Sequence, residues 1–138
     1  EGKTMEMKVS FPGNLRVDAE FEGFTVHTDQ PVASGGDGSG PAPFDLFLAS
    51  LATCAGIYML SFMKQRGISS EGAGLTMRSI ADSPGGMIRE TRFELHLPPA
   101  FPAKYEKAVV RAVEQCTVKR HLYEPPAFTV TTSRAAPV

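Results

Sequence analysis

The sequence lacks the features that would place it outside the cytosol or on a nucleic acid. It contains only two cysteines, its formal net charge is -1, and its first ten residues lack the basic-then-apolar order of an export signal. A nearly neutral chain has no electrostatic reason to bind nucleic acid or an anionic membrane. Two cysteines without an export signal favour a reducing compartment. We therefore expect a cytoplasmic protein that binds neither nucleic acid nor membrane.

Familiar catalytic and metal-binding motifs are also missing. The sequence has no nucleophile elbow, no H-E-x-x-H motif and no lysine at the spacing of a phosphate-binding loop. Its three histidines, His27, His96 and His121, are far apart and form no metal-ligand spacing with either cysteine. We expect these histidines at the surface and no metal site.

The patterns that are present predict strands in three parts of the chain. Alternating apolar residues predict an antiparallel hairpin over 5–21 and a third short strand over 24–28. A second hairpin is predicted over 73–98, with its turn at 83–86. After two prolines, residues 127–133 read as a final strand.

The longest apolar segment predicts a helix over 43–66, with eighteen uncharged residues between Asp45 and Lys64. Apolar residues occur on all its sides, so the helix is either fully buried or spans a membrane. Eighteen residues reach about 27 Å, close to the roughly 30 Å of a bilayer core. The segment contains many small residues, and the neighbouring strands need a core to cover. We therefore expect a buried helix that needs additional cover from a partner subunit.

A second helix is predicted by a regular apolar stripe that runs from Tyr105 to Cys116. The order is then strands, helix, strands, helix, strand, without regular βαβ alternation, which favours the α+β class. A length of 138 residues suits a single domain over the whole chain, with a core that needs no disulfide.

The two cysteines lie on apolar faces. Cys54 is in the middle of the first helix, and Cys116 ends the stripe of the second, so both are expected to point inward. They are 62 positions apart, and sequence alone does not establish a contact between them. They are either two ordinary buried thiols or a reactive pair.

The segments around both cysteines resemble the OsmC-like family, which includes osmotically inducible and organic hydroperoxide resistance proteins. The run PFDLFLASLATC at 43–54 looks like the first-cysteine helix of that family. The glycine-rich residues 35–37 and 40–41 match a loop of one branch. Residues 116–118, with Leu122, resemble the second-cysteine motif. The order of strands and helices is similar over nearly the whole chain.

The resemblance implies an intertwined homodimer in which antiparallel sheets wrap central buried helices. It implies thiol-dependent reduction of organic hydroperoxides or hydrogen peroxide, with Cys54 as the peroxidatic residue and Cys116 as the resolving one. Cys54 would become a sulfenic acid, Cys116 would condense with it to a disulfide, and an external dithiol, such as a lipoyl protein, would restore both thiols. It implies no metal or organic cofactor.

The sequence departs from the family in the groups that would activate Cys54. Only the thiolate is a good nucleophile, and apolar burial disfavours it. Peroxidase members supply an arginine held by a glutamate. Arg16 is the candidate arginine by position, although it also fits a solvated strand residue. Phe44 stands at the glutamate position, ten residues before the cysteine, and Asp45 follows it.

Asp45 is therefore either a clamp for Arg16 or a first-turn acid that complements the helix dipole. Two functions remain open. The first is a two-cysteine thiol peroxidase, with Cys54, Cys116, Arg16 and Asp45 as its site residues. The second is a non-catalytic OsmC-like domain that senses redox state or binds a small apolar ligand.

Overall fold

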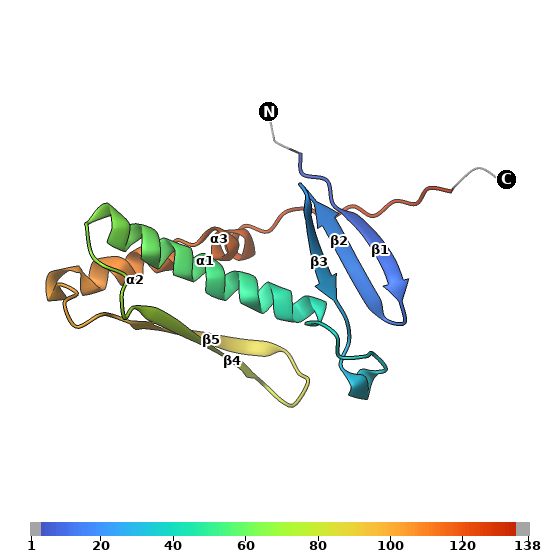
Figure 1. Ribbon diagram of the computed structural model, residues 1–138, viewed down its shortest axis with the longest axis horizontal. Helices are drawn as coiled ribbons and strands as arrows, with labels where there is room; N and C mark the ends of the chain where they lie inside the picture. The colour runs from blue at the N-terminus through green and yellow to red at the C-terminus, as the bar shows by residue number, and fades with distance from the viewer. Residues whose placement is uncertain (1–3, 135–138) are drawn as a thin grey trace. The chain divides into compact units, whose positions relative to one another are not determined.

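The structure is a computed structural model that describes residues 4–134, and the chain folds as two compact units, residues 1–50 and 51–138 (Figure 1). The strands are β1 (Lys8–Gly13), β2 (Arg16–Phe21), β3 (Phe24–Thr28), β4 (Gly74–Ala81) and β5 (Ile88–His96). The helices are η1 (Val32–Ser34), α1 (Pro43–Gln65), η2 (Ala103–Tyr105), α2 (Glu106–Glu114) and α3 (Thr117–Tyr123). These helices and antiparallel sheets confirm the predicted α+β class. The single domain stays a prediction.

The first unit contains the three-stranded sheet β1-β2-β3, in which both pairs of neighbours are antiparallel. The turn between β2 and β3 consists of Glu22 and Gly23, whose φ values are 48° and 83°. Two left-handed residues are what a tight hairpin turn requires. Phe21 and Phe24 close this turn as a cross-strand pair, with ring centroids 5.8 Å apart. The predicted first hairpin and third strand are confirmed.

Helix α1 begins and ends within one residue of its predicted bounds. At its carboxyl end Gly67 adopts φ 66°, and two backbone bonds close the last turn. Ile68 N–H donates to the Met63 carbonyl at 2.9 Å, and Gly67 N–H donates to the Lys64 carbonyl at 3.2 Å. This is a Schellman motif, which satisfies carbonyls that the helix leaves without partners.

One copy of the chain covers α1 only in part. Only one stripe of the helix is buried within the chain, and it consists of Leu51, Ala55, Met59, Phe62 and Met63. Ile57, on another face, is 53% exposed. By length and composition alone α1 could also cross a membrane. One copy of the chain therefore leaves part of α1 uncovered, as expected for a helix that needs a partner subunit, and the partner itself stays a prediction.

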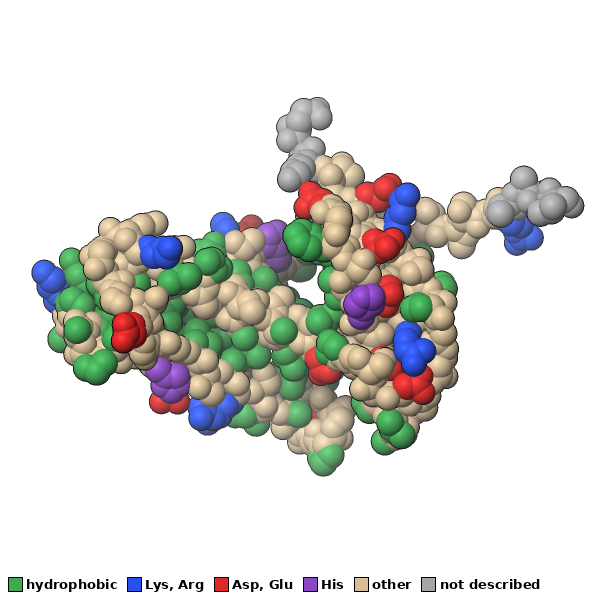
Figure 2. Space-filling model, in the orientation of Figure 1, with side chains coloured by type: hydrophobic (Ala, Val, Ile, Leu, Met, Phe, Trp, Pro, Cys, Tyr) green, Lys and Arg blue, Asp and Glu red, His purple; other side chains and the backbone are tan. Residues whose placement is uncertain are grey.

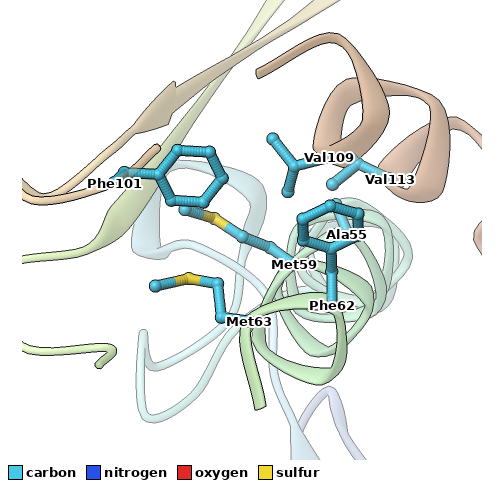
Figure 3. Close-up of a cluster of buried hydrophobic side chains, with 7 residues drawn as sticks. All are labelled: Ala55, Met59, Phe62, Met63, Phe101, Val109 and Val113. Carbon is cyan, nitrogen blue, oxygen red and sulfur yellow. The ribbon is translucent and has the colours of Figure 1, made fainter. Parts of the chain in front are cut away.

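The second unit has a packed apolar core between α1 and the elements that follow it. The buried cluster is Ala55, Met59, Phe62, Met63, Phe101, Val109 and Val113, seen in Figure 3. Side chains of the β4–β5 hairpin, including Leu75, Phe93 and Leu95, pack against this cluster. The predicted second hairpin and the apolar stripe of the second helix are confirmed.

Two predictions about the carboxyl-terminal part are wrong. Helix α2 ends at Glu114, and Cys116 has an extended backbone (φ -58°, ψ 142°) at the start of α3, a helix that we did not predict. Cys116 continues the apolar spacing of α2 although the helix has already ended, so periodicity does not reveal where α2 ends. Residues 127–133 form no strand, and Val130 is 92% exposed. A β-forming pattern needs a partner edge, and neither sheet of the described chain supplies one.

Candidate functional site

The two segments that carry the thiols are in direct contact. Cys54 is half-buried on α1, next to the fully buried Ala55, and both cysteines are free thiols. One helical turn after Cys54, the Tyr58 hydroxyl lies 2.9 Å from the hydroxyl of Thr117. Thr117 directly follows Cys116 in the chain. The hydrogen bond therefore joins the helix of the first thiol to the residue beside the second.

Cys116 is the more enclosed of the two thiols, with no exposed surface. Its Sγ atom accepts a hydrogen bond from the backbone N–H of Lys119 at 3.4 Å, so the sulfur caps the start of α3. The ammonium group of Lys119 lies 4.1 Å from the ring centroid of Phe93. The predicted inward orientation is confirmed for Cys116, whereas Cys54 is only partly enclosed.

A cavity of about 680 Å³ lies in the second unit, beside these segments. Its lining is Leu51, Thr91, Phe93, Leu95, Val110, Val113, Glu114, Gln115, Lys119, Leu122 and Tyr123. Leu51 lies one turn before Cys54, and Gln115 directly precedes Cys116. Such a volume, with apolar walls and a few polar groups, suits a small organic ligand.

Arg16, at the start of β2, is held in place by a loop of the first unit. Its Nη2 atom lies 2.8 Å from the carboxylate of Asp37, and its Nε–H donates to the Ser39 hydroxyl at 3.2 Å. Gly13 pairs with Arg16 across the hairpin, and a Cβ there would come within 3.4 Å of the guanidinium. Arg16 is thus a half-exposed but fixed cation rather than a freely solvated strand residue.

Asp45 has a different partner. Its carboxylate accepts a hydrogen bond from the backbone N–H of Ala42 at 3.0 Å, at the start of α1. The neighbouring Phe44 stacks on Phe47, with ring centroids 5.5 Å apart. The acid that binds Arg16 is Asp37, which sequence analysis did not single out. The signal that could have found it was an acid within the matching glycine-rich loop.

A buried carboxylate underlies this loop. Asp29 is 1% exposed and accepts hydrogen bonds from the backbone N–H groups of Gln30 (2.7 Å), Asp37 (3.3 Å) and Ser39 (3.0 Å). It also accepts the Ser39 hydroxyl proton at 2.6 Å. These bonds, the Ser39 hydroxyl first among them, lower the pKa of Asp29 from 3.8 to about 2 against the effect of burial. Asp29 is therefore ionised at neutral pH.

The predicted site residues thus fall in two places. Arg16 and Asp45 belong to the first unit, and Cys54 and Cys116 belong to the second. Their roles in a reaction stay predictions. The three histidines are exposed, as predicted. Among residues 4–134, no group of three or more His, Cys, Asp or Glu side chains could hold a metal ion.

Comparison with known proteins identifies the family. An osmotic stress induced and detoxification response protein from Psychrobacter arcticus 273-4 is similar over 87% of this chain and 88% of its own, at 23% identity and a TM-score of 0.71. An OsmC like protein from Mycoplasma pneumoniae matches over 91% of each chain, at 14% identity and a TM-score of 0.68.

An organic hydroperoxide resistance protein OsmC from Legionella pneumophila matches over 87% of this chain and 89% of its own, at 19% identity and a TM-score of 0.58. At such identities the likeness establishes the fold alone. No curated protein matches the sequence. A family model described as OsmC-like protein matches residues 36–131, a range that contains both cysteines. This chain therefore belongs to the OsmC-like protein family.

Proposed function

We propose that this protein is a thiol-dependent peroxidase that reduces organic hydroperoxides or hydrogen peroxide with Cys54 and Cys116. The observation that carries the proposal is the 2.9 Å hydrogen bond between Tyr58 and Thr117, which joins the segments of the two thiols. Membership of the OsmC-like family supports a redox or stress role. The similar Legionella protein is described as an organic hydroperoxide resistance protein.

The proposed reaction begins at Cys54. Its thiolate attacks one peroxide oxygen, an S–O bond forms, and the O–O bond breaks. The other oxygen leaves as an alkoxide or hydroxide and takes up a proton, which gives an alcohol or water. Cys54 is then a sulfenic acid, oxidised by two electrons.

Cys116 completes the cycle. Its sulfur attacks the sulfenic sulfur of Cys54, an S–S bond forms, and hydroxide leaves with a proton as water. An external dithiol then reduces the disulfide by two exchange steps and is itself oxidised to a disulfide. Cys116 is buried, so the segment that begins α3 must shift to expose the disulfide to that dithiol.

In this proposal Arg16 is the cation that assists the reaction of Cys54. A guanidinium stays protonated at any physiological pH, so the charge of Arg16 does not depend on its surroundings. Asp37 binds Arg16 in place of the glutamate that holds the arginine in peroxidase members of the family. Asp45 then serves α1, since its carboxylate accepts the Ala42 N–H at the positive end of the helix.

The cavity of about 680 Å³ favours organic hydroperoxides over hydrogen peroxide. Phe93, Leu95 and Val110 give it apolar walls that can take up the organic part of a substrate. The same cavity also supports a second candidate function. It could hold a small apolar ligand in a protein that senses or carries that ligand without turnover.

We also propose that the working protein is a homodimer. The alternating residues Met5, Met7, Val9 and Phe11 are all exposed, as are Ile57 of α1 and Phe128 near the carboxyl end. Figure 2 shows hydrophobic side chains at the surface of both units. Exposed apolar surface of this extent is typical of a protein that associates. A second copy would supply the cover that α1 lacks.

The peroxidase is tested by turnover. We expect the protein to consume cumene hydroperoxide in the presence of a lipoyl dithiol. Cys116→Ser should stop at a sulfenic acid on Cys54, which dimedone labels, whereas Cys54→Ser should consume nothing. No consumption by the native protein, together with saturable binding of an apolar fluorescent probe, would favour the second candidate.

A further inference from the structure

We propose that Asp29 is the positioning residue of Arg16. Its buried carboxylate builds the loop that presents Asp37 and Ser39 to the guanidinium. The consequence for Cys54 rests on the proposed peroxidase, whereas the positioning itself is a property of the first unit and can be measured separately.

Asp29 carries its charge in a buried position. A buried charge is costly unless it is paired or hydrogen-bonded. Asp29 meets this demand with four hydrogen bonds from three residues, at the start and the end of the loop. Two of those three residues, Asp37 and Ser39, are the ones that contact Arg16.

The hydroxyl of Ser39 lies between Asp29 and Arg16. A serine hydroxyl has one proton to donate. Ser39 gives that proton to Asp29 at 2.6 Å, so only its lone pairs face the Nε–H of Arg16 at 3.2 Å. The carboxylate of Asp29 thus orients the Ser39 hydroxyl so that its oxygen accepts the hydrogen bond from Arg16. An amide at position 29 has only one acceptor oxygen, so its NH2 group would face either the Gln30 N–H or the three donors that now share Oδ2.

Asp37 also contacts both Asp29 and Arg16. Its backbone N–H donates to Asp29 at 3.3 Å, and its side chain lies 2.8 Å from Arg16 Nη2. Ser39 and Asp37 therefore offer two acceptors to the Nε and Nη2 edge of the guanidinium. Two acceptors on one edge fix the plane of an arginine as well as its position.

The loop itself is compact rather than a flexible connector. Asp29 N–H donates to the Pro41 carbonyl at 3.1 Å, which brings its ends together, and Gly38 N–H donates to the Gln30 carbonyl at 3.0 Å. A side chain at Gly36 would collide with the backbone of Gln30. Residues 29–41 form a closed loop whose ends meet, as in an Ω-loop. Removal of its central carboxylate should loosen the whole loop.

The positioning is tested first by NMR of the Arg16 Nε–H signal, assigned by its loss in Arg16→Lys. We expect a resolved signal in the native protein, and its loss to solvent exchange in Asp29→Asn. Ser39→Ala removes only the hydroxyl and should weaken the signal in the same direction. Asp82→Asn breaks the Arg89–Asp82 pair of the second unit and should leave the Arg16 signal unchanged.

The consequence is tested in the Cys116→Ser background by the rate constant of Cys54 oxidation. We expect Asp29→Asn to slow it about tenfold, because a displaced Arg16 stabilises less of the negative charge that the reaction develops. Arg16→Gln should slow it at least as much, and the double variant should be no slower than Arg16→Gln alone, because both act through one cation.

The outcomes separate the two proposals. An Arg16 signal that persists in Asp29→Asn overturns the positioning role, whatever Ser39→Ala shows, because Ser39 contacts Arg16 directly. If Asp29→Asn does not fold, Asp29→Ser, with a smaller neutral side chain, takes its place, and a persistent Arg16 signal there overturns the role equally. If native Cys54 reacts no faster than a free cysteine, the peroxidase fails, and the NMR result still decides whether Asp29 positions Arg16.

Discussion

Each of the two units is stabilised internally by a different kind of interaction. In residues 4–50 the buried residues are Thr28, Asp29 and Gly36, so the first unit is organised by hydrogen bonds around a carboxylate. In the described part of the second unit the buried residues are mainly hydrophobic, from Leu51 to Cys116. The first unit therefore holds the carboxylate of Asp29 in place by hydrogen bonds, and the second encloses the thiol of Cys116 in an apolar core.

The difference also shows which unit depends on a partner. Three strands with one apolar face are stable when that face packs against something. The face that carries Val9 and Phe11 is exposed, and no large hydrophobic side chain in residues 4–50 is buried. The second unit has its own core. A partner subunit should therefore matter most to the first unit and to the open face of α1.

The largest effect is expected in the core of the second unit. Phe62→Ala removes a buried ring that packs on Phe101, with centroids 6.5 Å apart, and under Arg66, 3.6 Å from its centroid. We expect a loss of about 3–5 kcal/mol in the free energy of unfolding, measured in urea. Phe62→Leu, which keeps most of the volume, should cost less than about 1.5 kcal/mol. Equal losses for both variants would contradict a tightly packed core.

The next effect concerns the dimer. Ile57→Glu places a charge on the exposed face of α1, where a second copy is expected to pack. The dissociation constant should rise about a hundredfold or more, because the charge would be buried without a partner. Sedimentation should show a native dimer and a monomeric variant. Lys107→Glu, an exposed change on α2, is the control. A native protein that is monomeric at micromolar concentration contradicts the proposal.

The third effect is a pH dependence of the first unit. Because the pKa of Asp29 is lowered from 3.8 to about 2, its contribution to stability is complete above about pH 4. It is lost as the pH falls through about 2. The amide of Ser39 should therefore stay protected from hydrogen exchange down to about pH 4 and lose protection below it. Asp29→Asn should show low protection at every pH, and a parallel fall in both proteins would contradict this origin.

The smallest effect on stability compares two similar surface pairs. Arg16–Asp37 (2.8 Å) and Arg89–Asp82 (2.9 Å) are both partly exposed. Asp37→Asn and Asp82→Asn should each change the free energy of unfolding by less than about 1 kcal/mol. Only Asp37→Asn should slow the oxidation of Cys54. Equal rates in the two variants would remove Asp37 from the proposed machinery.

The sequence predicted those elements whose signals are local. Glu22-Gly23 specified a tight turn, and Pro43 and Gly67 marked the ends of α1. Each of these signals acts within a few residues of the backbone that it shapes. The two hairpins, the third strand and the first helix could therefore be predicted close to their observed bounds.

The failures concern partners that are distant or outside the chain. Asp37 is 21 positions from Arg16, and no local pattern pairs them. Cys116 continues the apolar period of α2 although the helix has already ended. Residues 127–133 have a β-forming pattern, yet one copy of the chain gives them no neighbouring strand. Periodicity reports which side of a segment is apolar, and it does not report what lies against that side.

The most direct test of the account is peptide mass mapping after one equivalent of cumene hydroperoxide is added to the fully reduced protein. The account predicts a single new crosslink, a disulfide between Cys54 and Cys116, and one equivalent of cumyl alcohol. Two intact thiols with the peroxide unconsumed would contradict it.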